Sequence, residues 1–284
     1  MQLITQRARS MEPTAKSACT SLFISHGAPD ILLTPSKTLQ FFSDLGKRLS
    51  PPDLVITISA HWVTRLPTFA SSPFPKTIHD FQGFPDSLYS LRYPAPGAPE
   101  VAAKLSEDLK RNGIPCQMDP HRGFDHGIWV PLSRIFPDAR IPVLPLSLPQ
   151  GFSPDSLLQL GTLLREAAPP NTLLFASGGA THNLSAYRPG QSPLPQSVAF
   201  DTWLRKSLTG KKDRDLLEYM EHSPFPRFNH PTDEHLFPLF VAMGYGYDAP
   251  RIHPLHEGFE GGSVSLASYG FEVPDTDPSA PGPR

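Results

Sequence analysis

The amino-acid sequence predicts a single α/β domain with a central, mostly parallel sheet flanked by helices. Three observations support this fold class: short apolar strand patterns alternate with helical patterns, no internal repeat is present, and no shift in composition marks a domain boundary. Alternating strands and helices are typical of a parallel sheet that is covered on both faces. A chain of 284 residues is long for one domain, but α/β enzymes often reach this length as one unit.

The strands are expected at short apolar runs, which are typical of strands buried on both faces. These runs are 21–25, 54–60, 141–148, 172–177 and, late in the chain, 264–273.

Helices are expected where apolar residues recur every three or four positions. In 99–112, Val101, Leu105 and Leu109 share one face, and Gly113 follows the last turn. The other helices are expected at 154–168, 196–208, 213–222 and 232–243.

The segment 67–99 is rich in proline and has little regular pattern. Loops of that length in compact domains are usually functional lids or binding loops. It contains His79 and Phe81, and we expect it to form a wall of a substrate pocket. The 35 prolines are spread along the whole chain, which favours a globular protein with rigid loops over disorder.

Charge and hydropathy narrow the possible partners. The formal net charge is −2, with no basic stripe of the kind that nucleic acid or an anionic membrane attracts. No apolar run approaches the ~18 residues that span a bilayer. Cys19 and Cys116 form no CxxC pair, so any metal site must be built mainly from histidines and carboxylates. We therefore expect a cytoplasmic protein that binds neither nucleic acid nor membrane.

The two ends of the chain differ from the domain at 19–273. Residues 1–18 contain three basic side chains but no apolar core of a secretory signal. They are expected to be disordered, with an organelle-targeting segment as the alternative. The Pro-rich tail 274–284 is also expected to be disordered.

Three of the 11 histidines lie at the carboxyl ends of predicted strands. His26 directly follows 21–25, His61 directly follows 54–60, and His182 follows 172–177 after a small loop. Ligands bind at this edge in open α/β sheets, and rigid strands would aim the three imidazoles at one point. The pattern favours a metal site, although a single histidine after a strand is more often a polar residue with no ligand role.

Other catalytic signatures are absent from the sequence. There is no GxSxG elbow, P-loop, GxGxxG fingerprint or HExxH motif.

Seven motifs in order resemble the class III extradiol ring-cleavage dioxygenases of the LigB-like family, in the DOPA 4,5-dioxygenase subgroup. They are SHGAPD (25–30), ISAHW (58–62), HDFQGFP (79–85), LRYPAPG (91–97), GFDHGIWVPL (123–132), SGGATHNL (177–184) and NHPTDEHLFPL (229–239). The resemblance runs from about residue 21 to about residue 271, nearly the whole chain.

The resemblance implies that O2 opens a catechol ring beside its two hydroxyls at one non-haem Fe(II), and that Zn(II) can occupy the same site. It implies that His26, His61 and His235 hold the metal. His182 corresponds to a histidine that is either a fourth metal ligand or the catalytic base.

Further residues are expected to contact the substrate. By the same resemblance, His126 is a catalytic histidine that meets the substrate or dioxygen, and His230 lines the pocket. His79 and Phe81 are expected substrate contacts on the 67–99 segment, where aromatic rings can stack on a catechol.

Glu234 is an alternative to His235 as the third ligand. Iron enzymes that cleave rings commonly use two histidines and one carboxylate. Adjacent side chains on a helix point about 100° apart, so one of the two must point away. We favour His235 as the ligand.

The predicted function is a metal-dependent extradiol dioxygenase that opens a DOPA-like catechol with O2, as a monomer or a small homo-oligomer. One alternative is a zinc-dependent hydrolase on the same histidines, because zinc with an open position activates water. The other is a non-enzymatic metal-binding module, in which the histidines would saturate the ion.

Overall fold

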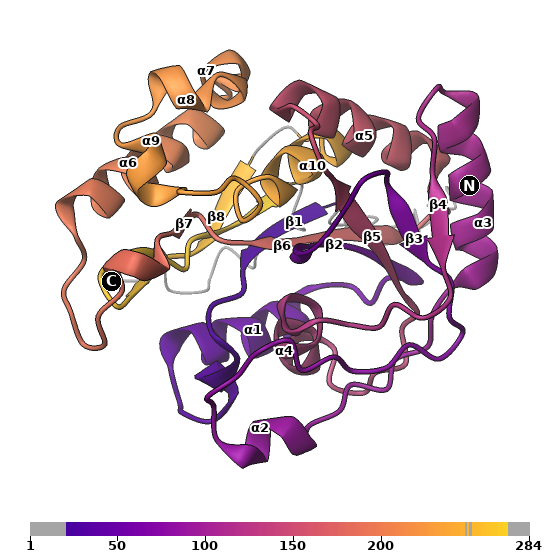
Figure 1. The fold of residues 1–284 in the computed structure, drawn as a ribbon, viewed down its shortest axis with the longest axis horizontal. Helices are drawn as coiled ribbons and strands as arrows, with labels where there is room; N and C mark the ends of the chain where they lie inside the picture. Colours follow the sequence, from indigo (N-terminus) through magenta and orange to yellow (C-terminus); the bar gives the residue numbers. More distant parts are fainter. Residues whose placement is uncertain (1–20, 248, 250–251, 272–284) are drawn as a thin grey trace, which may run out of the picture.

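The structure is a computed structural model that describes residues 21–247, 249 and 252–271. The predicted disordered segments 1–18 and 274–284 lie outside these residues. An eight-stranded sheet runs through the centre of the described part, with helices on both faces (Figure 1). This arrangement confirms the predicted single α/β domain.

The core of the sheet is parallel. Strands β5, β2, β6 and β1 pair in parallel, while β11 and β8 continue the sheet antiparallel beyond β1. A small second sheet holds β7, β10 and β9. The bounds along the large sheet are β4 (Gln117–Asp119), β3 (Thr68–Ala70), β5 (Val143–Pro149), β2 (Leu54–Thr64), β6 (Thr172–Gly178), β1 (Ser21–Ser25), β11 (Ser268–Phe271) and β8 (Ile252–His256), and in the small sheet β7 (Thr181–His182), β10 (Val264–Ser265) and β9 (Phe259–Glu260).

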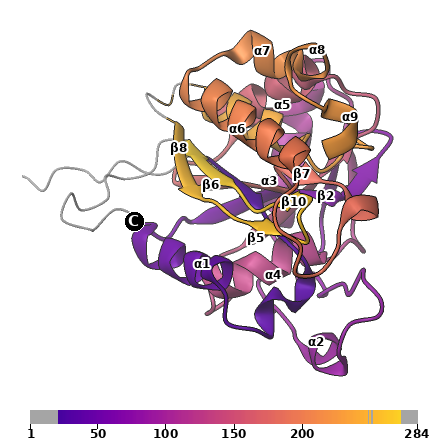
Figure 2. The same cartoon turned by 90° about the vertical axis from the view of Figure 1, so that its left-hand side faces the viewer.

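Helices cover the two faces of the large sheet (Figures 1 and 2). One face carries α3 (Pro99–Arg111), α5 (Pro154–Ala167), α10 (Pro238–Tyr245) and α6 (Pro195–Thr209), with the short α7 (Asp213–Leu217), α8 (Tyr219–His222) and α9 (Pro226–Asn229) beyond α6. The other face carries α1 (Lys37–Arg48) and α4 (His126–Ile135), with α2 (Asp86–Ser90), η1 (Pro29–Leu32) and η2 (Leu184–Ala186) in the loops. Each face has its own buried apolar cluster. Every residue of β1, β5 and β6 is therefore buried, which explains their continuous apolar runs.

Strand β2 is longer than predicted. It continues through His61 to Thr64, and its register against β5 shifts between Ser59 and Val63. His61 therefore lies within an irregular part of the strand and not just after it. Such bulges change the direction of a side chain and are frequent beside active sites.

The predicted helix 232–243 is wrong at its start. Helix α10 begins at Pro238, and His235 lies in the turn before it. Proline has no N–H and clashes with a preceding helical turn, so it is favoured in the first turn of a helix. Because His235 lies in a turn, helix geometry does not set the direction of its side chain.

The remaining differences are splits and additions. The predicted helix 213–222 is divided into α7 and α8, and the predicted strand 264–273 into β10 and β11. The segment 67–99, which was expected to be irregular, contains β3 and α2. No helix in the described residues is both long and apolar enough to cross a bilayer.

Candidate metal centre

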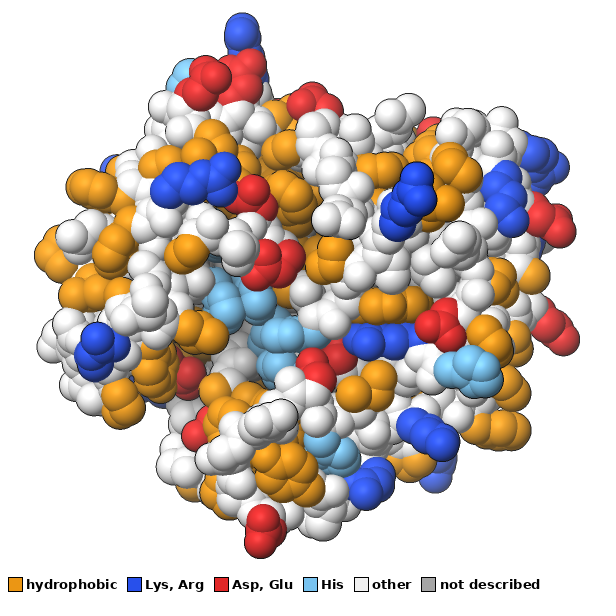
Figure 3. Space-filling view, viewed as in Figure 1, with side chains coloured by type: hydrophobic (Ala, Val, Ile, Leu, Met, Phe, Trp, Pro, Cys, Tyr) orange, Lys and Arg blue, Asp and Glu red, His pale blue; other side chains and the backbone are white. Residues whose placement is uncertain are grey.

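Five histidines gather at the carboxyl edge of the parallel strands. One directly follows β1, three lie in β2, α4 and β7, and one lies in the turn before α10. Figure 3 shows histidine side chains at the bottom of a hollow in the middle of the molecular face that it presents. The ring centroids are 4.9 Å apart for His26–His61, 5.6 Å for His26–His235, 5.1 Å for His61–His235, 4.0 Å for His61–His126 and 3.4 Å for His182–His235.

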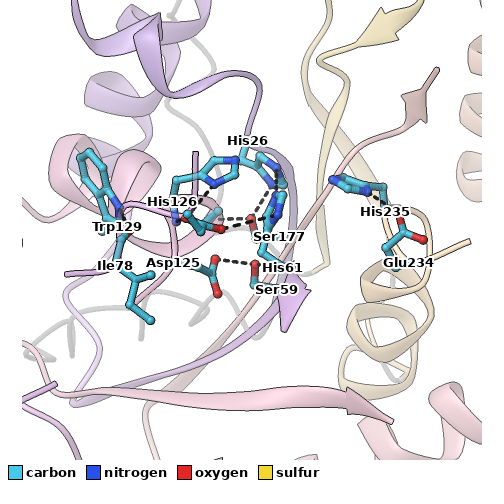
Figure 4. A network of polar contacts seen from close by, with 12 residues as sticks. His26, Ser59, His61, Ile78, Asp125, His126, Trp129, Ser177, Glu234 and His235 are labelled. Atoms are coloured by element: carbon cyan, nitrogen blue, oxygen red, sulfur yellow. Dashed lines mark hydrogen bonds and ion pairs between the residues drawn. The ribbon is translucent and has the colours of Figure 1, made fainter. Parts of the chain in front are cut away.

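His26 is held by a serine on the neighbouring strand. Its Nδ1 lies 2.9 Å from Ser177 Oγ, and Ser177 Oγ donates to the carbonyl of Gly127 at 2.5 Å (Figure 4). A hydroxyl has one proton, so Ser177 must accept from the N–H of His26 Nδ1. The neutral ring of His26 then carries its lone pair on Nε2, which is the form that a metal requires.

His61 faces His26 directly. The two Nε2 atoms are 3.0 Å apart. Two nitrogen lone pairs at that distance repel each other unless a proton or a cation lies between them. The arrangement therefore fits a pair of metal ligands.

His235 has a buried nitrogen that lacks a partner among the described residues. Its Nδ1 donates to Glu234 Oε1 at 3.0 Å, and its Nε2 has no hydrogen bond although the residue is only 5% exposed. Figure 4 shows Glu234 on the side of the His235 ring away from His26 and His61. A buried polar atom without a partner is costly, and a metal ion would satisfy it.

Glu234 therefore differs from its expected placement. Neither side chain points away from the other, because the two residues lie in a turn and their side chains meet. The carboxylate accepts from the ring of His235 and fixes its tautomer, as carboxylates commonly do for histidines that hold a metal. The hydrogen bond with His235 is the largest of the effects that lower the pKa of Glu234 to about 2.

His126 is the first residue of α4, and its Nδ1 lies 3.0 Å from Asp80 Oδ1. One ring nitrogen from each of His26, His61 and His126 lies within 4.8 Å of the other two. By distance alone, the third ligand could therefore be His126. The unpartnered nitrogen favours His235.

His182 stacks on His235, with 9° between the ring planes. It lines the same cavity as His26 and His61. Burial, and then the neighbouring His235, lower the pKa of His182 to about 3. Its neutral form therefore dominates near pH 7, with a lone pair free to accept a proton.

Burial lowers the pKa values of the other histidines in the cluster too. Burial and then the charge of neighbouring histidines lower the pKa of His61 to about 2 and that of His26 well below 6.5. Burial also lowers the pKa of His235 against the opposing effect of Glu234. Metal ligands must be deprotonated, and these rings are neutral near pH 7 without a metal.

Four of the five histidines, His26, His61, His126 and His182, line a cavity of about 470 Å³, and His235 lies behind this lining. Phe81 and Phe84 form an apolar part of its wall, and the carboxylates of Asp30 and Glu260 also line it. No lysine or arginine is among the described residues that line the cavity. Burial, and then the charge of Asp30, raise the pKa of Glu260. The cavity therefore suits an aromatic ligand, with negative charge on one part of the wall.

Two expected substrate contacts lie outside this cavity. His230 is fully buried, packs on Phe200 and donates its Nε2–H to the carbonyl of Ala180. His230 is not among the described residues that line the cavity, and its contact with a substrate stays a prediction. The ring of His79 packs against Phe81 and other aromatic side chains and is not part of the lining, so it supports the wall from behind.

Sequence reasoning missed the residues that orient the histidines. Asp80 and Ser177 each lie within a motif quoted above, but nothing in the chain pairs them with His126 and His26, which are 46 and 151 positions away. Burial opposes ionisation of Asp80, yet the hydrogen bonds from His126 lower its pKa to about 2.

Known proteins match almost the whole described chain. The profile of the family described as the catalytic LigB subunit of aromatic ring-opening dioxygenase matches residues 22–271. A 4,5-DOPA dioxygenase extradiol from Beta vulgaris is 35% identical over 256 residues, which cover 88% of this chain and 96% of that protein. One of the same name from Escherichia coli is 35% identical, covering 87% of this chain and 93% of that protein. The crystal structure of an uncharacterised E. coli K12 protein matches with a TM-score of 0.75 and 30% identity, covering 89% and 99% of the two chains.

Proposed function

The chain belongs to the LigB family of aromatic ring-opening dioxygenases and is a metal-dependent extradiol ring-cleavage dioxygenase, and from this premise we propose that it uses Fe(II), held by His26, His61 and His235, to open a DOPA-like catechol. The hypotheses of a zinc hydrolase and of a non-enzymatic metal-binding module are not favoured. The observation that carries the proposal is the buried, unpartnered Nε2 of His235 beside the facing Nε2 atoms of His26 and His61.

The donor set suits the proposed metal. When bound, Fe(II) would supply the redox chemistry that activates O2 toward the catechol ring. Zn(II) also prefers imidazole nitrogen, so it can occupy the same residues without supporting the redox reaction. Ser177 and Glu234 hold His26 and His235 with their Nε2 atoms unprotonated, so these two rings need not lose a proton before they bind a metal.

His182 is the proposed base. It is neutral near pH 7, lines the cavity and lies against His235. Binding to the metal would lower the pKa of a catechol hydroxyl, so that a neutral imidazole of low pKa at this place can accept its proton. We favour this role over that of a fourth ligand.

His126 is the proposed second catalytic histidine. Because its Nδ1–H is directed at Asp80, its neutral ring offers Nε2 as a hydrogen-bond acceptor. A proton gained there would leave an imidazolium that Asp80 stabilises, so the ring could later donate that proton. His126 lines the cavity, where it can reach a substrate oxygen.

The cavity wall supports a catechol with an amino-acid side chain. Phe81 and Phe84 offer aromatic surface for the ring. Asp30 and Glu260 form no ion pair with a described basic residue, and an ammonium group would offset their negative charge. DOPA carries an ammonium group of this kind, and two relatives are named for that substrate.

The proposal is tested by purifying the protein without oxygen, loading it with Fe(II) and adding L-DOPA. A yellow ring-opened product with matched uptake of O2 is the expected result. Zinc-loaded protein is the matched control and should form no product. Turnover by zinc-loaded protein without O2 uptake, or no product with Fe(II), would contradict the proposal.

A further inference from the structure

The N-cap residue of helix α4 does not cap the helix with its side chain. Asp125 holds the N-cap position, but its side chain makes no capping hydrogen bond. Its carboxylate accepts instead from Ser59 Oγ at 2.7 Å and from Arg122 Nη2 at 2.5 Å. The first N–H groups of a helix need an acceptor from elsewhere, and the backbone N–H of His126 is one of them.

Asp80 supplies that acceptor from the 79–85 segment. Its Oδ1 accepts from the backbone N–H of His126 at 2.9 Å and lies 3.0 Å from the Nδ1 of the same residue. One carboxylate oxygen therefore holds both the main chain and the ring of His126. Its other oxygen lies 3.7 Å from His61 Nδ1, beyond hydrogen-bond distance.

The backbone beside Asp80 is fixed to α4 and to the segment that leads into it. The indole N–H of Trp129 on α4 donates to the carbonyl of Ile78 at 3.0 Å, and the N–H of Ile78 donates to the carbonyl of Phe124 at 2.7 Å. These bonds determine where Asp80 can lie. The next residue, Phe81, lines the cavity, so one short segment both forms the cavity wall and holds the histidine.

We propose that Asp80 is the positioning residue of His126. Asp80 keeps the proton of the His126 ring on Nδ1 and turns Nε2 of that ring toward the cavity. A carboxylate accepts but does not donate, so the facing nitrogen must carry hydrogen. Without Asp80, the ring would be free to rotate and to exchange tautomers. The expected effect of Asp80 on kcat rests on the proposed function. The tautomer of His126 can be measured without turnover.

The kinetic test compares Asp80→Ala, Asp80→Asn and Asp86→Asn in Fe(II)-loaded protein with L-DOPA as substrate. Asp80→Ala is expected to lower kcat by about 10–100-fold, the usual effect of removing a partner of this kind, with KM and metal content near those of the wild type. Asp80→Asn should lose less, because its amide oxygen can still accept from His126. Asp86 is exposed and begins α2, just after the 79–85 segment, so Asp86→Asn should retain wild-type kcat.

Two kinetic outcomes would overturn the proposal. One is a kcat of Asp80→Ala within about two-fold of the wild type. The other is loss of the metal from Asp80→Ala, which would make Asp80 part of the metal site. If Asp80→Ala does not fold, Asp80→Leu decides, because leucine has a similar size but no acceptor, and unchanged kcat in that variant counts against the role.

The second test measures the tautomer of His126 by nitrogen-15 NMR in zinc-loaded protein with labelled histidine. A His126→Gln variant identifies the signals. The wild type should show the proton on Nδ1, and Asp80→Ala should show a mixture or the other tautomer. An unchanged tautomer would overturn the proposal. If wild-type protein opened no catechol, the proposed function would fail, but this measurement would still decide the role of Asp80.

Discussion

His235 and His126 compete for the third place in the proposed ligand set, and substitution separates them. We expect His235→Ala to bind little Fe(II) or Zn(II), because the buried Nε2 that lacks a partner would be lost. We expect His126→Ala to keep its metal but lose turnover by about 100-fold or more. Metal content after dialysis and kcat with L-DOPA would measure both effects. Metal loss in His126→Ala with full metal in His235→Ala would reverse the assignment.

Ser177 affects the metal through the tautomer of His26. In Ser177→Ala, His26 Nδ1 loses the acceptor at 2.9 Å, so its proton is no longer held away from the metal side. We expect the affinity for Zn(II) to fall by about 10–100-fold, measured by competition with a chelator. The exposed Ser87 gives the control Ser87→Ala, which should match the wild type. Equal affinity in both variants would show that Ser177 does not orient the ring.

Glu260 is the residue that should discriminate among catechols. Its Oε2 lies 3.8 Å from the position that a Cβ would take on Gly27, the neighbour of His26. We expect Glu260→Gln to raise KM for L-DOPA by about 2–5-fold, the loss expected for one partly exposed charge pair, and to leave KM for 4-methylcatechol unchanged. A parallel change for both substrates would mean that Glu260 shapes the cavity without recognising an ammonium group.

At the scale of elements, the end of β6 and the turn that carries His235 are packed main chain to main chain. A Cβ on Gly178 would lie 2.1 Å from the carbonyl oxygen of His235, and Gly179 N–H donates to the same oxygen at 2.9 Å. We expect Gly178→Ala to cost about 1–3 kcal/mol of unfolding free energy and to weaken metal binding by displacing His235. Denaturant unfolding and metal titration would measure the two effects.

Gly179→Ala is the matched control for that strand end. The nearest atom to its Cβ would be the carbonyl oxygen of Thr181 at 3.4 Å, so little must move. Its unfolding free energy should stay within about 1 kcal/mol of the wild type. Equal stability of the two variants would contradict close packing as the reason for glycine at 178.

The sequence was informative where local pattern decides the structure. Apolar runs predicted the strands that end near His26 and His182, because a strand buried on both faces must be apolar throughout. The start of α10 was missed, because periodicity across 232–243 concealed the effect of Pro238. His235 was identified only by family resemblance, since no strand precedes it. Its role as a ligand remains a prediction.

The contacts that orient the site could not be read from the chain. Asp80 and His126 are paired by the bridge between 77 and 124 and by the Trp129 hydrogen bond, which are tertiary contacts. Burial of His230 likewise depends on how the elements pack around Phe200. Spacing along the sequence contains neither kind of information, whereas the convergence of strand ends follows from sheet topology.

At the scale of the whole molecule, the fold keeps several histidines neutral, and this makes its stability depend on pH. Burial lowers the pKa of His230 to about 4, and burial also lowers the pKa values of His26, His61, His182 and His235. In the unfolded chain each would titrate near its ordinary value of about 6.5. Below that pH the unfolded state binds more protons than the folded state.

The sign follows from this difference in bound protons. A histidine with a lowered pKa contributes stability above about pH 6.5, and the contribution is lost as the pH falls toward the folded value. For His230 the loss between pH 7.5 and pH 5.5 is about 1.4 kcal/mol, and the other four act in the same direction. We therefore expect the Tm of metal-free protein to fall between these pH values, measured by calorimetry. The exposed His121 provides the control, because His121→Gln should show the same fall as the wild type. A Tm that is constant or rises as the pH falls would mean that the cluster accepts protons without unfolding.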